Sequence, residues 1–438
     1  SRSCLMYRYH RLPEARKYAI ENGYRGAMFP WQSGSTGVEE TQELHLNPKS
    51  GKWGPDLSRR QRHVSLAIAY NVWDYWKKVG DRDFLIQHGA ELLLSIAQFF
   101  TSLVEFNKKD GRYHTKGVMG PDEFHEKLPG SKEAGLPDNA YTNIMIVWLL
   151  RRMEEMMNIL PGKDIIRLLR KLDLTPRDLD KMDDITRKMN VVINDDGIIS
   201  QFDGYFGLEE LDWDGYRQKY GNIHRMDRIL KAEGKSPDDY KLAKQADTLM
   251  LFYLLPMDEV HDLLTRLGYA HYRNMMKENY EYYVDRTSHG STLSRVVHCV
   301  VAWRLHRYAV AWKWFQDVLR SDIYDTQGGT TMEGIHTGVM GGSIDMVMRG
   351  IGGIDFHEDR IYLKPRLPSK WKRLKMKLLY KTTWVSFTFT KEEALIEVHA
   401  PVLLPIEYKG HLHYGLPGEK IRIDLKKKEK RRNNKRKK

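Results

Sequence analysis

The chain has 438 residues, of which 41% are hydrophobic and 29% charged, a composition typical of a soluble globular protein with more than one domain. Its formal net charge of +13 would suggest a nucleic-acid-binding protein, but ten Lys or Arg residues and one Glu fall within 426–438. Without this +9 the rest of the chain carries only +4, so the charge balance excludes a general nucleic-acid-binding surface.

Cysteine content and hydropathy exclude further classes. The two cysteines, Cys4 and Cys299, cannot build a disulfide framework or a cysteine-rich zinc site, and they favour a reducing compartment. No apolar run approaches the ~20 residues of a membrane span, and residues 1–25, which are charged throughout, show no signal peptide. We therefore expect a cytoplasmic protein with no membrane partner.

Helical periodicity dominates residues 57–355. Apolar residues recur every fourth position from Val64 to Trp76, and Asp138 can cap a helix through Tyr141. Gly- and Pro-rich loops separate these segments, with no strand alternation between them, which predicts a helical toroid. Further helices are predicted at 176–190, 238–255, 258–266, 268–283, 291–305, 307–320 and 339–350.

The period changes to two near residue 356. Val385, Phe387 and Phe389 alternate with polar residues, and 421–425 and, more weakly, 361–364 repeat the pattern. The sequence therefore predicts three parts. They are a helical catalytic domain at 1–355, a small antiparallel β-domain at 356–425 and a disordered basic tail at 426–438, which is either solubilising or a weak polyanion contact.

The segment Gly120-Pro121-Asp122-Glu123-Phe124-His125-Glu126 combines turn chemistry with three carboxylates and a histidine. Cleavage of a glycosidic bond needs a carboxylic acid that is still protonated near neutral pH. Glu123 is the candidate, because Asp122 and Glu126 are close enough to raise its pKa by like-charge repulsion. The alternative is a solvated acidic loop.

Other polar segments are less specific. The hydroxyls of Ser288–Ser294 precede an apolar run and can form an oxyanion cradle at a helix start, or simply cap the helix. Lys244 and Gln245 are expected on the 238–255 helix, where the lysine either pairs with a buried anion or reaches solvent. His336 follows a Gly-Gly-Thr-Thr loop, and a lone histidine is more often structural. Trp31, in a Pro- and Gly-bounded loop, is a candidate for sugar stacking.

The sequence contains no metal-ligand histidine pair, dinucleotide fingerprint or phosphate-cradling P-loop, so we expect neither a metal nor a cofactor. Taken together, six segments in this order resemble glycoside hydrolase family 65, which holds maltose, trehalose, kojibiose and nigerose phosphorylases. The segments are Gly26–Gly34, Gly120–His125, Asn139–Asn143, Lys244–Asp247, Ser288–Ser294 and Thr330–His336.

The resemblance implies a mainly α fold, an (α/α)6-barrel that is incomplete at its N-terminus, with a small C-terminal antiparallel β-domain. It implies that Glu123 is the single general acid. Trp31 would line the glucose subsite, and Gln32, where several relatives have a carboxylate, would change the acceptor-side contacts. The remaining roles are binding of sugar and phosphate oxygens by Lys244 and Gln245, and binding of inorganic phosphate by Ser291, Thr292 and His336.

The implied reaction is inverting phosphorolysis of an α-linked glucose disaccharide to β-glucose 1-phosphate and a free sugar, with phosphate as co-substrate. A homodimer is left open. One alternative is an inverting hydrolase in which Glu333 activates water. Another is an inactive sugar-binding remnant, because the N-terminal β-sandwich and first barrel segment of the family have no match in this chain. No residue decides which linkage is cut.

Overall fold

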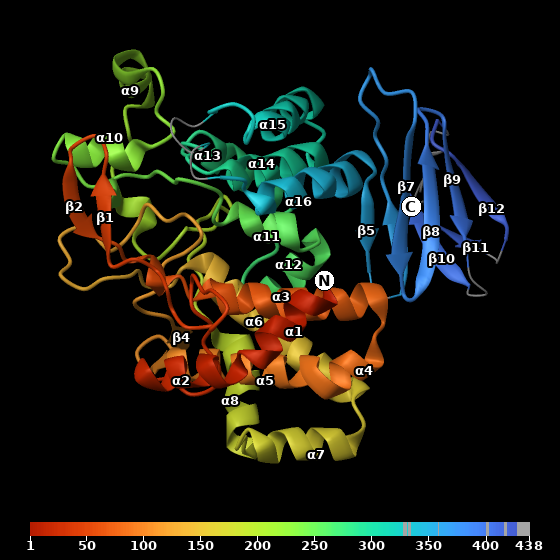
Figure 1. Cartoon of the computed structure of the whole chain (residues 1–438), viewed down its shortest axis with the longest axis horizontal. Coiled ribbons are helices and arrows are strands. Elements are labelled where there is room, and N and C mark those ends of the chain that lie inside the picture. The colour runs from red at the N-terminus through yellow and green to blue at the C-terminus, as the bar shows by residue number, and fades with distance from the viewer. Residues whose placement is uncertain (327–330, 332–333, 358, 400–402, 416–417, 427–438) are drawn as a thin grey trace, which may run out of the picture. The chain divides into compact units, whose positions relative to one another are not determined.

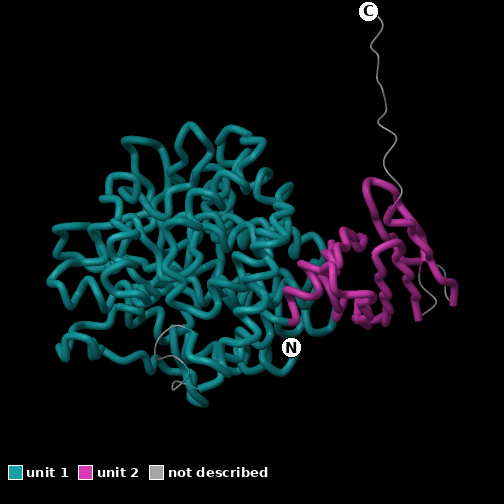
Figure 2. The backbone as a smooth tube through the Cα atoms, turned by 90° about the horizontal axis from the view of Figure 1, so that it is seen from above, with its two compact units in different colours: residues 1–76, 82–343 teal, residues 77–81, 344–438 magenta. Residues whose placement is uncertain are grey.

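We describe a computed structural model of the chain, covering residues 1–326, 331, 334–357, 359–399, 403–415 and 418–426. Glu333 and the basic tail beyond Lys426 lie outside the described residues. The chain forms two compact units, one of residues 1–76 and 82–343 and one of residues 77–81 and 344–438 (Figure 2). Each unit is treated by itself below.

The first unit is helical (Figure 1), although its helices at 2–10, 12–21, 162–171, 213–220 and 226–232 were not among the predicted ones. The bounds of the α-helices are α1 Arg2–His10, α2 Leu12–Glu21, α3 His63–Val79, α4 Arg82–Phe84, α5 Ala90–Leu103, α6 Ala140–Ile159, α7 Gly162–Lys171, α8 Pro176–Lys188, α9 Trp213–Tyr220, α10 Met226–Ala232, α11 Leu249–Leu254, α12 Met257–Arg266, α13 Met275–Val284, α14 Thr292–Arg304, α15 Tyr308–Arg320 and α16 Thr337–Asp345. Short 3-10 turns of this unit are η1 Ser58–Arg60, η3 Tyr205–Gly207 and η4 Pro237–Asp239, and η2 Leu85–Gly89 is a π-turn. A second π-turn, η6 Met346–Ile351, belongs to the other unit.

Two groups of helices form the core of this unit. The almost wholly buried α5 packs on α6, which also contacts α8 and α12, while α14 packs on α11, α13 and α15. A buried carboxylate of the first group pairs with two partly exposed cations of α2 and α7. Glu91 of α5 accepts hydrogen bonds from Arg16 at 2.8 Å and from Lys171 at 2.7 Å. Burial raises the pKa of Glu91, but these two cations outweigh it, so the pKa is lowered overall.

The loops between helices contain two short hairpins that the sequence did not reveal. They are β1 Leu44–Asn47 with β2 Lys52–Pro55, and β3 Glu105–Asn107 with β4 Arg112–His114. Strands of three or four residues show too little alternation to be recognised by period.

Two local helix predictions were wrong. The N-cap of α6 is Asn139, whose side chain accepts from the Thr142 amide at 3.0 Å, whereas Asp138 has a φ of 46° and faces the preceding loop. The helix predicted at 238–255 is confined to α11, and Ala243 instead forms a parallel bridge with Thr287. Tertiary hydrogen bonds hold this segment extended, against its helical pattern.

The second unit is the small β-domain. Its strands are β5 Ile354–Phe356, β6 Ile361–Leu363, β7 Leu374–Tyr380, β8 Thr383–Phe389, β9 Glu393–Val398, β10 Leu404–Tyr408, β11 His411–Gly415 and β12 Lys420–Asp424. They form two four-stranded sheets, ordered β11-β10-β6-β5 and β12-β9-β8-β7. The pairing is antiparallel except between β10 and β6.

The predicted alternation sets the core of this domain. Val385, Phe387 and Phe389 of β8 are buried, while Trp384, just before them, is exposed. They pack with apolar residues of the other strands into one cluster. The predicted fold class, mainly helical with a small C-terminal β-domain, is therefore confirmed.

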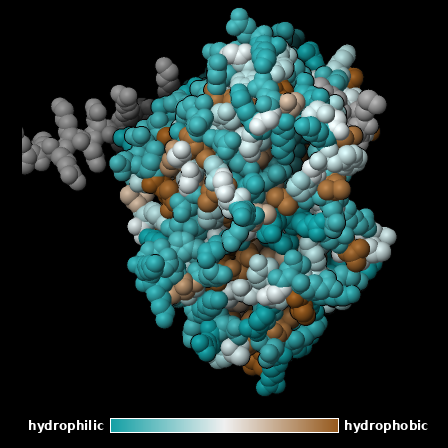
Figure 3. Space-filling view, turned by 90° about the vertical axis from the view of Figure 1, so that its left-hand side faces the viewer, coloured by the Kyte–Doolittle hydropathy of each residue, from teal (hydrophilic) through white to brown (hydrophobic). Residues whose placement is uncertain are grey.

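The surface in Figure 3 is mainly hydrophilic, with hydrophobic residues in small separate groups. Among the described residues, no helix combines the length and the apolar character needed to cross a bilayer.

Candidate active site

The loop that carries Glu123 is tightly constrained. Glu123 has a φ of 64°, a left-handed conformation that non-glycine residues seldom adopt and that often marks functional positions. Three residues earlier, a Cβ added to Gly120 would lie 2.1 Å from Asp247 Oδ2 and 2.3 Å from Asn139 Nδ2. Only glycine therefore fits at the start of this turn, and the turn fixes where Glu123 points.

The Glu123 carboxylate is held by Lys244 and Gln245, for which the resemblance implied binding of sugar and phosphate oxygens. Lys244 Nζ lies 2.7 Å from Glu123 Oε2, and Gln245 Nε2 donates to Glu123 Oε1 at 3.1 Å. The same Gln245 amide also donates to the Pro121 carbonyl oxygen. About 21% of the Glu123 side chain is exposed, so the carboxylate is held in place yet open to a ligand.

The neighbouring acids do not point at Glu123 as predicted. Asp122 is buried, accepts from the Lys244 amide at 2.7 Å and lies 2.6 Å from His125 Nδ1. Glu126 is directed to Lys231 at 3.3 Å. The charged group within hydrogen-bond reach of Glu123 is therefore Lys244 rather than a carboxylate.

The His125 ring is protonated on both nitrogens and links the loop to two acceptors. Its Nε2 lies 2.9 Å from the Tyr240 carbonyl oxygen and its Nδ1 faces Asp122, so both ring nitrogens donate to acceptors. Burial lowers the pKa of His125, but the Asp122 carboxylate outweighs it and the pKa is raised.

A second buried acid, Asp247, lies beneath this loop. It accepts from Asn139 Nδ2 at 3.2 Å and from the Asp122 amide at 3.4 Å. Burial raises the pKa of Asp247 to about 8, with a further contribution from the Asp122 carboxylate. Asp247 is therefore largely protonated at neutral pH.

The hydroxyl-rich loop lies directly against Lys244. The Gly290 amide donates to the Lys244 carbonyl oxygen at 2.8 Å, and the Ser288 amide donates to that of Ala243, also at 2.8 Å. Ser291 is the N-cap of α14 and accepts from the Leu293 amide at 3.3 Å, while Thr292 is the first, buried residue of that helix. Helix capping is therefore present beside the residue that holds Glu123, and the oxyanion cradle stays a prediction.

Packing brings His336 to the same end of α14. It precedes α16, whose Gly338 and Gly342 pack closely on Leu293 and Val296 of α14, so the two helices start side by side. The His336 ring lies 2.8 Å from Asp322, which also accepts its backbone amide at 2.9 Å.

Trp31 reaches the Glu123 loop through a buried histidine. Its ring lies 5.6 Å from that of His63, whose Nδ1 is 3.4 Å from the carbonyl oxygen of Met119, just before Gly120. Burial lowers the pKa of His63 to about 4, so this ring is neutral. Gln32 follows Trp31 and is exposed.

Sequence reasoning overlooked several residues that hold these side chains in place. Glu39 accepts the amides of Trp31 at 3.0 Å and Gln32 at 3.2 Å, which fixes their loop. Asp322 and Asp247 act similarly beneath His336 and the Glu123 loop. Glu39 and Asp322 lie only 8 and 14 residues from Trp31 and His336, but they are in irregular loops where no spacing motif marks such a pair. Asp247 was the exception, because it ends the Lys244–Asp247 segment.

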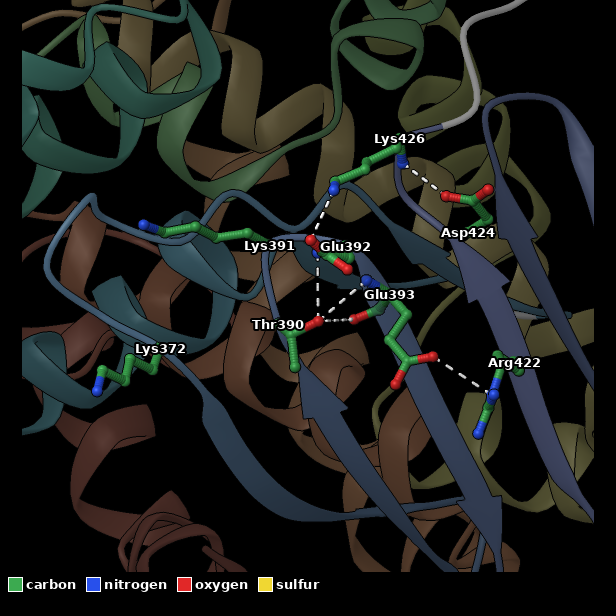
Figure 4. A pocket seen from close by; sticks show the side chains of 8 residues that line it. All are labelled: Lys372, Thr390, Lys391, Glu392, Glu393, Arg422, Asp424 and Lys426. Atoms are coloured by element: carbon green, nitrogen blue, oxygen red, sulfur yellow. Dashed lines mark hydrogen bonds and ion pairs between the residues drawn. The ribbon is translucent and has the colours of Figure 1, made fainter.

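Two surface hollows contain none of the predicted site residues. One, of about 430 Å³, lies on α6 and α12 and is lined mainly by charged side chains such as Arg151 and Asp262. The other, of about 900 Å³, is in the β-domain, where Lys426–Glu392 and Arg422–Glu393 ion pairs line it (Figure 4). In the part of the chain that the structure describes, no group of three or more His, Cys, Asp and Glu residues is placed to hold a metal ion.

Comparison with protein families decides the classification. The Glycosyl hydrolase family 65 central catalytic domain matches residues 1–345, and the C-terminal domain of the same family matches residues 354–414. The chain belongs to glycosyl hydrolase family 65. The recognition made from six short segments is confirmed.

Similar proteins include several disaccharide phosphorylases. An uncharacterized glycosyl hydrolase of Mycobacterium tuberculosis is 48% identical over 97% of this chain and 32% of its own length. The trehalose 6-phosphate phosphorylase of Lactococcus lactis is 41% identical over 93% of this chain and 51% of its own. The kojibiose phosphorylase of Caldanaerobacter subterraneus is 31% identical over 91% and 49%.

A solved structure, described as a putative kojibiose phosphorylase from human microbiome, superposes on 97% of this chain with a TM-score of 0.78 and 25% identity. The matched part is 57% of that chain. This family 65 chain thus spans about a third to a little over half of the proteins it resembles.

Proposed function

We propose that this family 65 protein carries out inverting phosphorolysis of an α-linked glucose disaccharide, giving β-glucose 1-phosphate and a free sugar. The observation that carries the proposal is one positioned carboxylate, Glu123, joined through Lys244 to the hydroxyl- and amide-rich start of α14. The phosphorylase names of several relatives support it.

In this reaction Glu123 protonates the glycosidic oxygen while phosphate attacks the anomeric carbon from the opposite face. Phosphate is already an anion at neutral pH, so the reaction needs no second carboxylate as a base. It needs donors that hold the phosphate in line, and we assign these to Ser291, Thr292 and His336.

Lys244 has a further part in this scheme. In the structure its ammonium is paired with Glu123. An incoming phosphate is a competing anion for Lys244, so we expect phosphate to draw the ammonium towards itself and leave the carboxyl group to the sugar oxygen. Gln245 would keep Glu123 oriented, and Trp31 would stack against the glucose ring.

A panel of α-glucosides tests the proposal. Trehalose, trehalose 6-phosphate, kojibiose, maltose and nigerose are incubated with and without inorganic phosphate, and β-glucose 1-phosphate is measured. We expect product from at least one sugar, only when phosphate is present, and loss of at least 100-fold in Glu123→Gln with the fold retained. Glucose release at the same rate without phosphate would refute phosphorolysis in favour of hydrolysis. Full turnover by the Glu123→Gln variant would refute the assigned acid.

A further inference from the structure

Arg295 is a buried arginine that the proposed reaction does not yet use. It lies on α14, one helical turn after Ser291, and only 5% of it is exposed. Its Nε and Nη1 atoms are buried and, among the described residues, have no hydrogen-bond partner. A buried guanidinium with unpaired donors is costly, and such a group is usually matched by an anion.

Among the described residues, the hydrogen bond of Arg295 to His224 connects it to the candidate site. Arg295 Nη2 lies 3.4 Å from His224 Nε2, and His224 Nδ1 lies 2.7 Å from the Ser288 carbonyl oxygen. A carbonyl oxygen only accepts, so His224 Nδ1 carries the proton and Nε2 accepts from Arg295. Burial lowers the pKa of His224, and Arg295 lowers it further, which agrees with a neutral ring.

The backbone between Ser288 and Ser291 is closely surrounded by positive side chains. A Cβ added to Gly290 would lie 2.4 Å from the His224 carbonyl oxygen, 3.1 Å from Lys244 Cγ and 3.4 Å from Arg225 Cδ. Only glycine fits there, because the backbone packs closely against these three residues.

The nearby cations differ in how their charge is compensated. Lys244 pairs with Glu123 at 2.7 Å, and Arg225 pairs with Asp227 at 2.8 Å. For Arg295, no ion pair is recorded among the described residues, and Asp317 is the acid that acts on it through space. Arg295 is therefore the cation near the start of α14 that has no hydrogen-bonded carboxylate among the described residues. The positive end of the helix dipole at this terminus also favours an anion.

We propose that Arg295, positioned by His224, binds a phosphoryl dianion at the start of α14. This deepens the proposed function and rests on it for the identity of the site. The phosphoryl group has two sources that share this chemistry, the inorganic phosphate of the reaction and the phosphoryl group of a phosphorylated sugar.

Binding is measured without turnover, so that it can be judged apart from activity. Isothermal titration and thermal unfolding are recorded with inorganic phosphate, with glucose 6-phosphate and with sodium chloride of equal ionic strength. The proteins are the wild type, Arg295→Met, Arg295→Lys and, as a matched control, Arg152→Met. Arg152 is also largely buried but pairs with Glu155 at 2.7 Å on α6.

We expect one of the two phosphoryl compounds to raise the Tm of the wild type and of Arg152→Met. In Arg295→Met its Kd should rise about 10- to 100-fold, because charge-assisted hydrogen bonds are lost. Arg295→Lys keeps the charge but not the planar set of donors, so its Kd should lie between those of the wild type and Arg295→Met. Without ligand, Arg295→Met should be at least as stable as the wild type, since an uncompensated buried charge is removed.

The pattern of ligands identifies the source. A response to inorganic phosphate assigns Arg295 to the attacking nucleophile, and a response to glucose 6-phosphate alone assigns it to a phosphorylated substrate. Equal affinity in the wild type and Arg295→Met would overturn the proposal. It would also be overturned if neither compound stabilised the wild type beyond sodium chloride, a result that remains decisive if the Met variant does not fold. If Glu123→Gln lost turnover but still bound the phosphoryl compound, the role proposed for Arg295 would be supported independently of catalysis.

Discussion

Asp247→Asn tests whether a protonated acid supports the loop that carries Glu123. Asp247 is 4% exposed, contacts Asn139 and the Asp122 amide, and has its pKa raised by burial from 3.8 to about 8. The unfolded carboxyl group loses its proton near pH 4, whereas the folded one keeps it to about pH 8. The unfolded state therefore binds fewer protons in this window, and stability falls as the pH rises.

The size of this pH dependence follows from the single proton that Asp247 keeps in the folded state and loses in the unfolded state. The contribution of Asp247 to the free energy of unfolding falls by about 1.4 kcal/mol per pH unit, or about 3 kcal/mol from pH 5 to pH 7. Asparagine cannot ionise and has nearly the same shape, so the variant should lack this slope. Relative to the wild type, Asp247→Asn should gain about 3 kcal/mol between pH 5 and pH 7.

Urea unfolding followed by tryptophan fluorescence at pH 5, 6 and 7 measures this difference. Asp178→Asn is the control, because hydrogen bonds to Thr175 and Arg25 outweigh burial and lower the pKa of Asp178. The stability that Asp178 contributes is present above pH 4 and is lost as the pH falls. The difference in the free energy of unfolding between the wild type and Asp178→Asn should therefore stay constant from pH 5 to pH 7. The reasoning would be refuted if the free energy of unfolding of Asp247→Asn also differed from that of the wild type by the same amount at all three pH values.

Three further predictions concern stability and the site. Glu91→Gln should lower the free energy of unfolding by about 1–3 kcal/mol at pH 7, and urea titration should show this loss shrinking as the pH falls through the lowered pKa. Gly120→Ala should cost about 1–3 kcal/mol by overpacking, whereas Gly162→Ala, where a Cβ meets nothing within 4 Å, should leave the Tm unchanged or higher. Lys244→Met should reduce phosphorolysis at least 10-fold with the circular dichroism spectrum unchanged, and wild-type kinetics would exclude Lys244 from the reaction.

The sequence by itself determined the fold class, and it predicted where the chemistry is to be expected. Apolar residues recur with a period of 3.6 up to residue 355 and with a period of two around Val385. These periods reflect which residues must be buried, and burial is what drives folding. The Gly-Pro turn before Glu123 could also be recognised from the sequence, because few other residues fit the backbone of a tight turn.

The tertiary structure decided what surrounds each site residue. The prediction that Asp122 and Glu126 face Glu123 failed because His125 and Lys231 attract them, and Lys244 comes from a segment about 120 residues away. The predicted helix at Lys244 failed because its amide donates to Asp122 instead of to a helical carbonyl. Local pattern fixes which side chains are buried, but charge pairing and hydrogen bonding between distant segments appear only when the chain is folded.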